Sequence, residues 1–301
     1  WGNQRHPRVS ARVISAQNRK NDMFDAPMVM KGRRGLIMGV ANDHSIAWGI
    51  ARVLAQSGAS LAFTFQGEAQ ARRVRPLAES VGTKIVIPCD VENDDDLDVV
   101  FATLKHEWGS LDFVVHSLAH SDRNELKGRY VETSRANFLR TLNISCYSFT
   151  DVARRASQLM VSKKDGGNGG SMLTLTYGGA TRVMPNYNVM GVAKAALETS
   201  VRYLASDLGS DGIRVNAISA GPMRTLAGSA VGDARMVFKW NKAHSPLKAN
   251  ISLDHVGGSA LYLLSELSGG VTGEVHFVDA GYNVVGMPPT GDLKGWIPPE
   301  N

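Results

Sequence analysis

The sequence predicts a single α/β domain built on a seven-stranded, doubly wound parallel sheet. Two observations support this fold class. Short apolar runs rich in Val, Ile, Leu and Phe recur along the chain, and helical patterns separate them. The runs are too short for helices, and parallel strands covered on both faces have this composition. Right-handed crossovers then place helices on both faces of one Rossmann-type sheet. The expected strands cover 35–40, 61–65, 85–88, 111–116, 172–176, 213–218 and 275–278.

Three of the expected helices show their own start signals. Ser45 is a plausible N-cap before an apolar face over 46–54. Asn93 precedes a helix with three aspartates in its first turn, where carboxylates interact favourably with the helix dipole. A further helix is expected to begin near Ser252. Two longer helices are expected at Tyr130–Val161 and Tyr187–Gly209.

The basic charge is concentrated at the N-terminus. The chain has 301 residues with 33 basic and 28 acidic side chains, and five of the basic ones lie in residues 1–21, which hold no acidic residue. The remaining chain is neutral overall, which argues against a nucleic-acid partner. Residues 1–27 superficially resemble a transit peptide, but we expect a disordered tail or an artificial extension. Residues 28–301 are expected to form the single domain.

Several other classes of protein are disfavoured. No run of 18 apolar residues occurs, so we expect no membrane span. Cys89 and Cys146 lie in apolar contexts and are interpreted as reduced core residues of a cytoplasmic protein. The eight histidines form no HxH or HExxH pattern, so no metal site is expected.

The first expected strand runs into a glycine and then a helix. At this position Gly39 would let the backbone approach a pyrophosphate, and the helix N-terminus after Ser45 would offer N–H groups to it. The spacing is not the usual GxGxxG, so an ordinary strand–helix turn remains an alternative. Gln66 follows the second strand, where the adenine ribose would lie. Because Gln66 is neutral and Glu68 is close, we expect NADH rather than NADPH, unless Gln66 is merely a solvated turn residue.

A tyrosine and a lysine share one helical face. Tyr187 and Lys194 are seven residues apart, or two helical turns. A nearby ammonium would lower the pKa of the phenol, which would suit a group that stabilises a developing oxyanion. The alternative is an ordinary surface pair on an amphipathic helix.

The segment Thr174–Lys194 resembles the active site of the bacterial enoyl-acyl-carrier-protein reductases, the NADH-linked branch of the short-chain dehydrogenases. That branch places six residues between the tyrosine and the lysine, as between Tyr187 and Lys194, and a second tyrosine ten residues upstream, as Tyr177. Further motifs match in order from about Lys31 to Val285. They are GVANDHSIAWG at 39–49, CDV at 89–91, VHSLA at 115–119, RVNAISAGP at 214–222, RTLA at 224–227 and TGEV at 272–275.

The resemblance implies a role for individual residues. The catalytic residues would be Tyr177, Tyr187 and Lys194, and the substrate would also contact Ser121. The cofactor NADH or NAD⁺ would contact Gly39, Ser45, Ile46, Gln66, Asp90, Val91, Leu118, Lys194, Met223, Arg224, Thr225, Leu226 and Ala227. Ala119 and His120 depart from the pattern of many relatives, which puts the width of the pocket in doubt.

The implied reaction is reduction of the 2,3-double bond of a trans-2-enoyl chain on acyl carrier protein, in fatty acid synthesis. Residues 224–248 are expected to form a mobile lid over the acyl chain. The lid is strongly basic, through Arg224, Arg235, Lys239, Lys242 and Lys248 against Asp233, so it is a candidate docking surface for an acidic carrier protein. A solvated helix face is the alternative. The two long helices are partly apolar on their outer faces, and relatives pair such helices into homotetramers.

Three other functions remain open on the sequence. The nearest is a short-chain dehydrogenase that reduces a carbonyl, although the six-residue spacing and Tyr177 argue against it. The second is a regulatory protein that binds the cofactor but has no catalytic activity. A nucleic-acid-binding module is the third.

Overall fold

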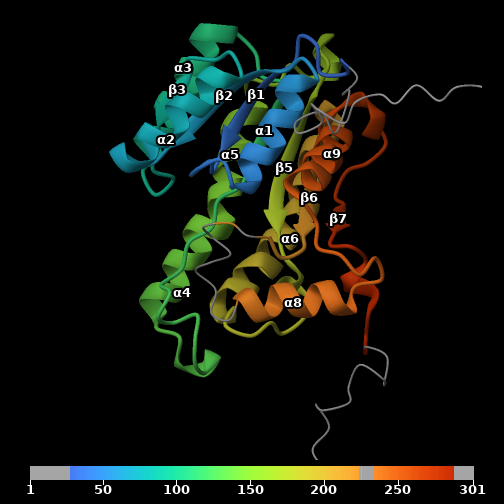
Figure 1. Cartoon of the computed structure of the whole chain (residues 1–301). Coiled ribbons are helices and arrows are strands. Elements are labelled where there is room, and N and C mark those ends of the chain that lie inside the picture. The colour runs from blue at the N-terminus through green and yellow to red at the C-terminus, as the bar shows by residue number, and fades with distance from the viewer. Residues whose placement is uncertain (1–27, 224, 226–233, 288–301) are drawn as a thin grey trace, which may run out of the picture.

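The central element of the protein is one seven-stranded parallel sheet, in the order β3-β2-β1-β4-β5-β6-β7 (Figure 1). The computed structural model describes residues 28–223, 225 and 234–287. The strands are β1 (Arg34–Met38), β2 (Ser60–Phe65), β3 (Val86–Pro88), β4 (Phe113–His116), β5 (Gly170–Thr176), β6 (Ile213–Ala220) and β7 (Val275–Val278). The predicted fold class and all seven expected strands are confirmed.

Helices connect successive strands and cover both faces of the sheet (Figure 1). They are α1 (Ile46–Gln56), α2 (Gly67–Ser80), α3 (Asp94–Trp108), α4 (Arg135–Leu142), α5 (Ser148–Ser157), α6 (Asn188–Leu208), α8 (Ala234–His244) and α9 (Leu253–Leu264). Two expected start signals are confirmed. The Asn93 side chain accepts a hydrogen bond from the amide of Asp95, and Ser252 forms a capping box with His255.

The long helix expected over 130–161 is shorter and interrupted. Its first regular helix, α4, begins after Ser134, whose hydroxyl caps it and also bonds Glu125 at 2.8 Å. A π-helical turn, Asn143–Tyr147, then separates α4 from α5. Such a turn inserts an extra residue into the helical ladder and is frequent at functional sites.

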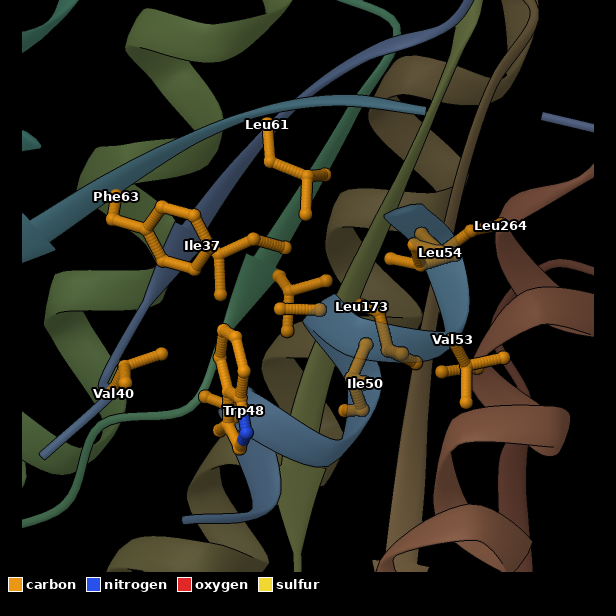
Figure 2. Close-up of a cluster of buried hydrophobic side chains, with 14 of the residues drawn as sticks. Ile37, Val40, Trp48, Ile50, Val53, Leu54, Leu61, Phe63, Leu173 and Leu264 are labelled. Carbon is orange, nitrogen blue, oxygen red and sulfur yellow. The ribbon is translucent and has the colours of Figure 1, made fainter. Parts of the chain in front are cut away.

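Two hydrophobic layers enclose the sheet. One joins α1, α2 and α9 to alternate strand residues, and Figure 2 shows Ile50 and Leu54 of α1 beside Ile37 and Leu173 of the sheet. The other joins α3, α5 and α6 to the remaining strand residues. Because strand side chains alternate between faces, one apolar run serves both layers. Truncating a fully buried side chain such as Ile50 to alanine costs about 2–5 kcal/mol in such a core.

The elements expected to carry function lie at one end of the sheet. In Figure 1, α8 and the lower part of α4 lie beyond the end toward which the β5 arrow points, which is the carboxyl end of that strand. Ligands of open parallel sheets bind at this end, where neighbouring connections leave in opposite directions. Within the described ranges, no helix combines the length and the apolar character that a membrane crossing requires.

Candidate active site

The carboxyl ends of β1 and β4 meet at Gly39. Its φ of +98° belongs to the left-handed region. A Cβ atom built there would collide with the carbonyl oxygen of Ser117, so the two backbones approach closely only because the residue is glycine. The chain leaves β1 toward α1 and leaves β4 toward α4, so this junction is the switch point of the sheet. The geometry fits a dinucleotide lying across the ends of the two strands.

Ser45 occupies the N-cap position of α1, but the expected side-chain cap is wrong. Its Oγ instead accepts hydrogen bonds from the amides of Ala41 and Asn42, both at 3.0 Å, and donates to Asn42 Oδ1 at 3.2 Å. The hydroxyl therefore ties the loop 41–45 together. The N–H groups of the first turn of α1 receive no bond from this hydroxyl, and a helix N-terminus of this kind is suited to an anion.

Gln66 and Asp90 come together at the ends of β2 and β3. Gln66 Nε2 donates to Asp90 Oδ2 at 2.8 Å, and Asp90 Oδ1 accepts from the amide of Glu92 at 3.0 Å. A carboxylate has about four acceptor positions, so Asp90 retains capacity for an additional donor. A neutral amide and a carboxylate at this edge suit a free ribose hydroxyl better than a 2′-phosphate.

Tyr177 and Tyr187 form an edge-to-face pair with ring centroids 5.1 Å apart and planes at 67°. Tyr177 follows β5, and Tyr187 precedes the first residue of α6. Gly179 lies against the edge of the Tyr187 ring, because a Cβ there would be 2.7 Å from Tyr187 Cε1 and closer still to Cδ1. The absence of a side chain at Gly179 therefore sets where the Tyr187 ring lies.

Two asparagines hold the backbone on either side of Tyr187. Asn186 has φ +56° and Asn188 has φ +26°, values that cost energy for most residues but are tolerated by asparagine. Asn188 Nδ2 also donates to the carbonyl oxygen of Glu125 at 3.1 Å, which ties the start of α6 to a distant loop. Our sequence reasoning missed Gly179, Asn186 and Asn188. The Pro-Asn-Tyr-Asn run was the available signal, since it is typical of a strained turn.

The expected lowering of the Tyr187 pKa is wrong. Burial raises the pKa of Tyr187 well above its ordinary value, and the neighbouring Tyr177 raises it further. Burial likewise raises the pKa of Tyr177 to about 12. Desolvation of the charged form thus outweighs any attraction to a cation. Tyr187 is a neutral hydrogen-bond donor at neutral pH.

Lys194 lies one and a half turns into α6 and is almost fully buried. Its Nζ donates to the carbonyl oxygen of Leu175 on β5 at 2.8 Å. Burial lowers its pKa to about 8, while Cys146 and Glu198 act in the opposite direction. The structure therefore brings the tyrosine pair and the lysine to the carboxyl end of β5, as the helical spacing predicts. A surface pair is excluded by this burial.

Comparison with known proteins supports the same interpretation. The sequence profile described as enoyl-(acyl carrier protein) reductase matches residues 39–283. An enoyl-[acyl-carrier-protein] reductase [NADH] of Rhizobium meliloti is 62% identical over 266 residues, which is 88% of this chain and 97% of the relative.

The chain belongs to the enoyl-acyl-carrier-protein reductase family.

Solved structures of this reductase family agree with the fold. A FabI crystal structure from Candidatus Liberibacter asiaticus has a TM-score of 0.83 and 58% identity, and the match covers 86% of this chain and 98% of that one. The enoyl reductase of Anaplasma phagocytophilum, solved in complex with NAD, also has a TM-score of 0.83 and 58% identity, covering 87% and 98% of the two chains. The enoyl reductase fold is thus shown over almost the whole length of these relatives.

Ser121, expected to contact substrate in this reductase, lies within a buried hydroxyl network. Its Oγ bonds Asn137 Oδ1 at 3.3 Å and accepts from Thr141 Oγ1 at 3.0 Å, both residues being on α4. The network ties the loop after β4 to α4. Ala119 and His120, by contrast, are exposed, and the main chain of His120 bonds Ser145 Oγ.

The remaining expected cofactor residues are only partly described. Four of them are half-buried: Ile46 is the first residue of α1, and Val91, Leu118 and Met223 follow β3, β4 and β6. The amide of Thr225 donates to the carbonyl oxygen of Met223 at 3.0 Å. Arg224, Leu226 and Ala227 lie outside the described residues.

The described part of the expected lid is the helix α8. Trp240 Nε1 donates to Tyr282 Oη at 3.0 Å, so the helix contacts the turn that follows β7. A pocket of about 230 Å³ lies beside this contact. It is bordered by Tyr177, which follows β5, by residues 219–222 at the end of β6, by Asn241 of α8, and by Asp279 and Tyr282. The pocket therefore reaches one member of the tyrosine pair, Tyr177.

Proposed function

We propose that this protein uses NADH to reduce the 2,3-double bond of a trans-2-enoyl chain carried on acyl carrier protein, in the elongation cycle of fatty acid synthesis. The observation that carries the proposal is the site at the end of β5. There, the Tyr177–Tyr187 pair and the buried Lys194 occur together in a chain of the enoyl reductase family.

The residues at the carboxyl end of the sheet fit the nicotinamide dinucleotide. Gly39 and the first turn of α1 would lie against the pyrophosphate, and Gln66 and Asp90 against the adenosine half. An ammonium has three donors, and Leu175 accepts one of them, so Lys194 has donors to offer a ribose diol. Met223 and Thr225 at the end of β6 would border the nicotinamide.

When bound, NADH would supply the hydride that is added to C3 of the enoyl thioester, and a proton taken up from solvent at C2 would complete the saturated chain. As that bond forms, negative charge develops on the thioester oxygen, and the neutral Tyr187 hydroxyl would donate a hydrogen bond to it. A phenol with a raised pKa keeps its proton, so the donor is present at every physiological pH. Tyr177 packs edge-on against this ring and would restrict its rotation.

The test is steady-state reduction of crotonyl thioester with NADH and with NADPH, beside a panel of ketones. We expect turnover of the enoyl substrate and a preference for NADH. The variant Tyr187→Phe should lose about 10²–10³-fold in kcat, as expected for loss of one oxyanion donor, with little change in NADH affinity. Full turnover by that variant, or activity on ketones alone, would refute the proposal.

The exposed face of α8 suits an acidic carrier protein. Arg235, Lys239 and Lys242 are exposed and recur at positions i, i+4 and i+7, so they form one basic stripe beside the active-site end of the sheet. Replacing Lys239 and Lys242 by glutamate should raise KM for the carrier-linked substrate but leave KM for a short thioester analogue unchanged. Equal effects on both substrates would count against docking at this stripe.

We further propose a cytoplasmic homotetramer. Large apolar side chains on the outer surfaces of the two long helical segments support it, since exposed apolar groups gathered on neighbouring helices are typical of subunit interfaces. They are Val131, Leu139, Tyr147, Val161 and Tyr203. Sedimentation analysis should give four times the chain mass, and replacing Tyr203 by glutamate should lower it.

A further inference from the structure

Three consecutive residues of β5 each bond a different buried titratable side chain. Thr174 Oγ1 lies 3.1 Å from His116 Nδ1, the carbonyl oxygen of Leu175 accepts from Lys194 Nζ at 2.8 Å, and Thr176 Oγ1 donates to Glu198 Oε1 at 2.8 Å. All three titratable side chains are less than a tenth exposed. They lie on the face of the sheet covered by α5 and α6.

Lys194 and Glu198 are one helical turn apart on α6, so they share a face of the helix. Glu198 is also one turn from Arg202, which is exposed. The charged residues of this face therefore alternate as cation, anion and cation. Among the described residues, no carboxylate oxygen lies within 4 Å of Lys194 Nζ. The carboxylate is close enough to interact with the ammonium through space but makes no direct ion pair with it.

This separation has a chemical advantage. A buried ammonium is costly unless an opposite charge compensates it, yet a direct ion pair would occupy donors that a ligand needs. A carboxylate held one turn away supplies the charge and leaves the donors free. We propose that Glu198 is a positioning residue of the reductase, whose carboxylate, held by Thr176, keeps Lys194 charged at the carboxyl end of β5.

The electrostatic environment of Lys194 agrees with this role. Burial lowers its pKa to about 8, and Cys146 from the π-helical turn and Glu198 from α6 both oppose that shift. His116 from β4 adds no positive charge near neutral pH, because burial and the neighbouring Lys194 lower its pKa to about 3. Burial raises the pKa of Glu198 itself, whereas Thr176, Arg202 and Lys194 lower it. The charge on Lys194 is therefore only marginally stable at working pH and depends on its neighbours.

The inference rests on the proposed function, in which Lys194 holds the nicotinamide ribose, but it can be tested without turnover. The dissociation constant of NADH is measured by fluorescence from pH 6 to pH 9 in the whole protein and in Glu198→Gln. The glutamine keeps an oxygen for Thr176 and removes the charge. We expect the pH at which affinity falls to move down by about one unit, so that affinity at pH 8 drops several-fold while affinity at pH 6 changes less than twofold.

Two further variants make the result specific. Thr176→Val keeps the carboxylate but removes the bond that favours its charged form, so it should move the pH dependence in the same direction by less. Thr176→Val also provides the test of the proposal if Glu198→Gln fails to fold. Cys146→Ser removes the other side chain that opposes the lowering of the Lys194 pKa, and the Glu198→Gln shift should persist when it is added to this variant. Unaltered pH profiles in Glu198→Gln or, failing that variant, in Thr176→Val would overturn the proposal, as would a Glu198→Gln shift that disappears in the Cys146→Ser background.

The same proteins separate this inference from the proposed function. If the unaltered protein does not reduce crotonyl thioester but the Glu198→Gln shift in NADH binding appears, the function fails and the role of Glu198 stands. If the unaltered protein reduces crotonyl thioester but Glu198→Gln changes neither the pH profile of turnover nor that of NADH binding, only the role of Glu198 fails.

Discussion

Replacing Gly179 by alanine should move the Tyr187 ring without touching its hydroxyl. The new Cβ would lie 2.7 Å from Tyr187 Cε1, where ordinary contact begins at about 3.4 Å, and it would lie closer still to Cδ1. The edge of the ring must therefore retreat by roughly 1 Å, since close-packed interiors leave no room for a closer contact. Misplacing a catalytic group by about 1 Å can cost about 10²-fold in rate.

The neighbouring glycine provides a matched control. A Cβ at Gly178 would meet nothing within 4 Å, and its φ is not in the left-handed region. Gly178→Ala should therefore keep at least half of the turnover, whereas Gly179→Ala should lose about 10²-fold in kcat with unchanged NADH affinity.

The assay is the rate of NADH oxidation with saturating crotonyl thioester, together with the melting temperature of each variant. In the double variant Gly179→Ala with Tyr187→Phe, the two losses should not add, because both act through one hydroxyl. Equal kcat for Gly178→Ala and Gly179→Ala would show that the packing of Gly179 does not hold the phenol. Additive losses in the double variant would show that Gly179 acts elsewhere.

Three other predictions follow from burial and backbone geometry. The pKa of His116 is about 3 in the fold and about 6.5 in the unfolded chain, so only the unfolded state takes up this proton as the pH falls below 6.5. The free energy of unfolding should therefore decrease toward acid by up to about 1.4 kcal/mol per pH unit. The urea midpoint should fall less from pH 7 to pH 5 in His116→Asn than in the unaltered protein. Ala280 has φ +61°, so Ala280→Gly should raise the unfolding free energy by about 0.5–1 kcal/mol, and a lower melting temperature would contradict the assigned strain. Burial raises the pKa of Cys89 to about 12, with Asp96 and Asp90 adding to the shift, so iodoacetamide at pH 8 should modify Cys89 only after denaturation, as peptide mass mapping would reveal.

The strand pattern was predictable because parallel strands with helices on both faces must be apolar throughout. The run at 111–116 illustrates this, since Phe113 and Val115 enter one hydrophobic layer and Val114 enters the opposite one. The helix interruption at Asn143–Tyr147 was not predictable, because the apolar spacing of its residues resembles that of a continuous helix. Its residues bond the loop after β4, through Ser145 and His120, and α6, through Cys146 and Ser200, and such tertiary contacts are not visible in the sequence.

The candidate site likewise has features that were predictable from the sequence and features that were not. The spacing of Tyr187 and Lys194, and the glycine at 39, are properties of the chain that suggested an oxyanion donor and a dinucleotide, and the resemblance of the surrounding motifs to a known family decided between these interpretations and their alternatives. Ser45 shows the limit of this reasoning, because one hydroxyl can cap a helix or organise a loop, and the path of residues 41–45 selects the second.

By itself, the sequence determined the order of strands and helices, the family, and the side chains available for chemistry, because periodicity and motif spacing are local properties. The tertiary structure alone decided the charge states at the site. Desolvation depends on how many atoms surround a group, and those around Tyr187 and Lys194 come from strands and helices far apart in the chain. For this reason Tyr187 is harder to ionise than its spacing from Lys194 suggested. For the same reason we propose that Glu198, one turn further along α6, helps to keep Lys194 charged.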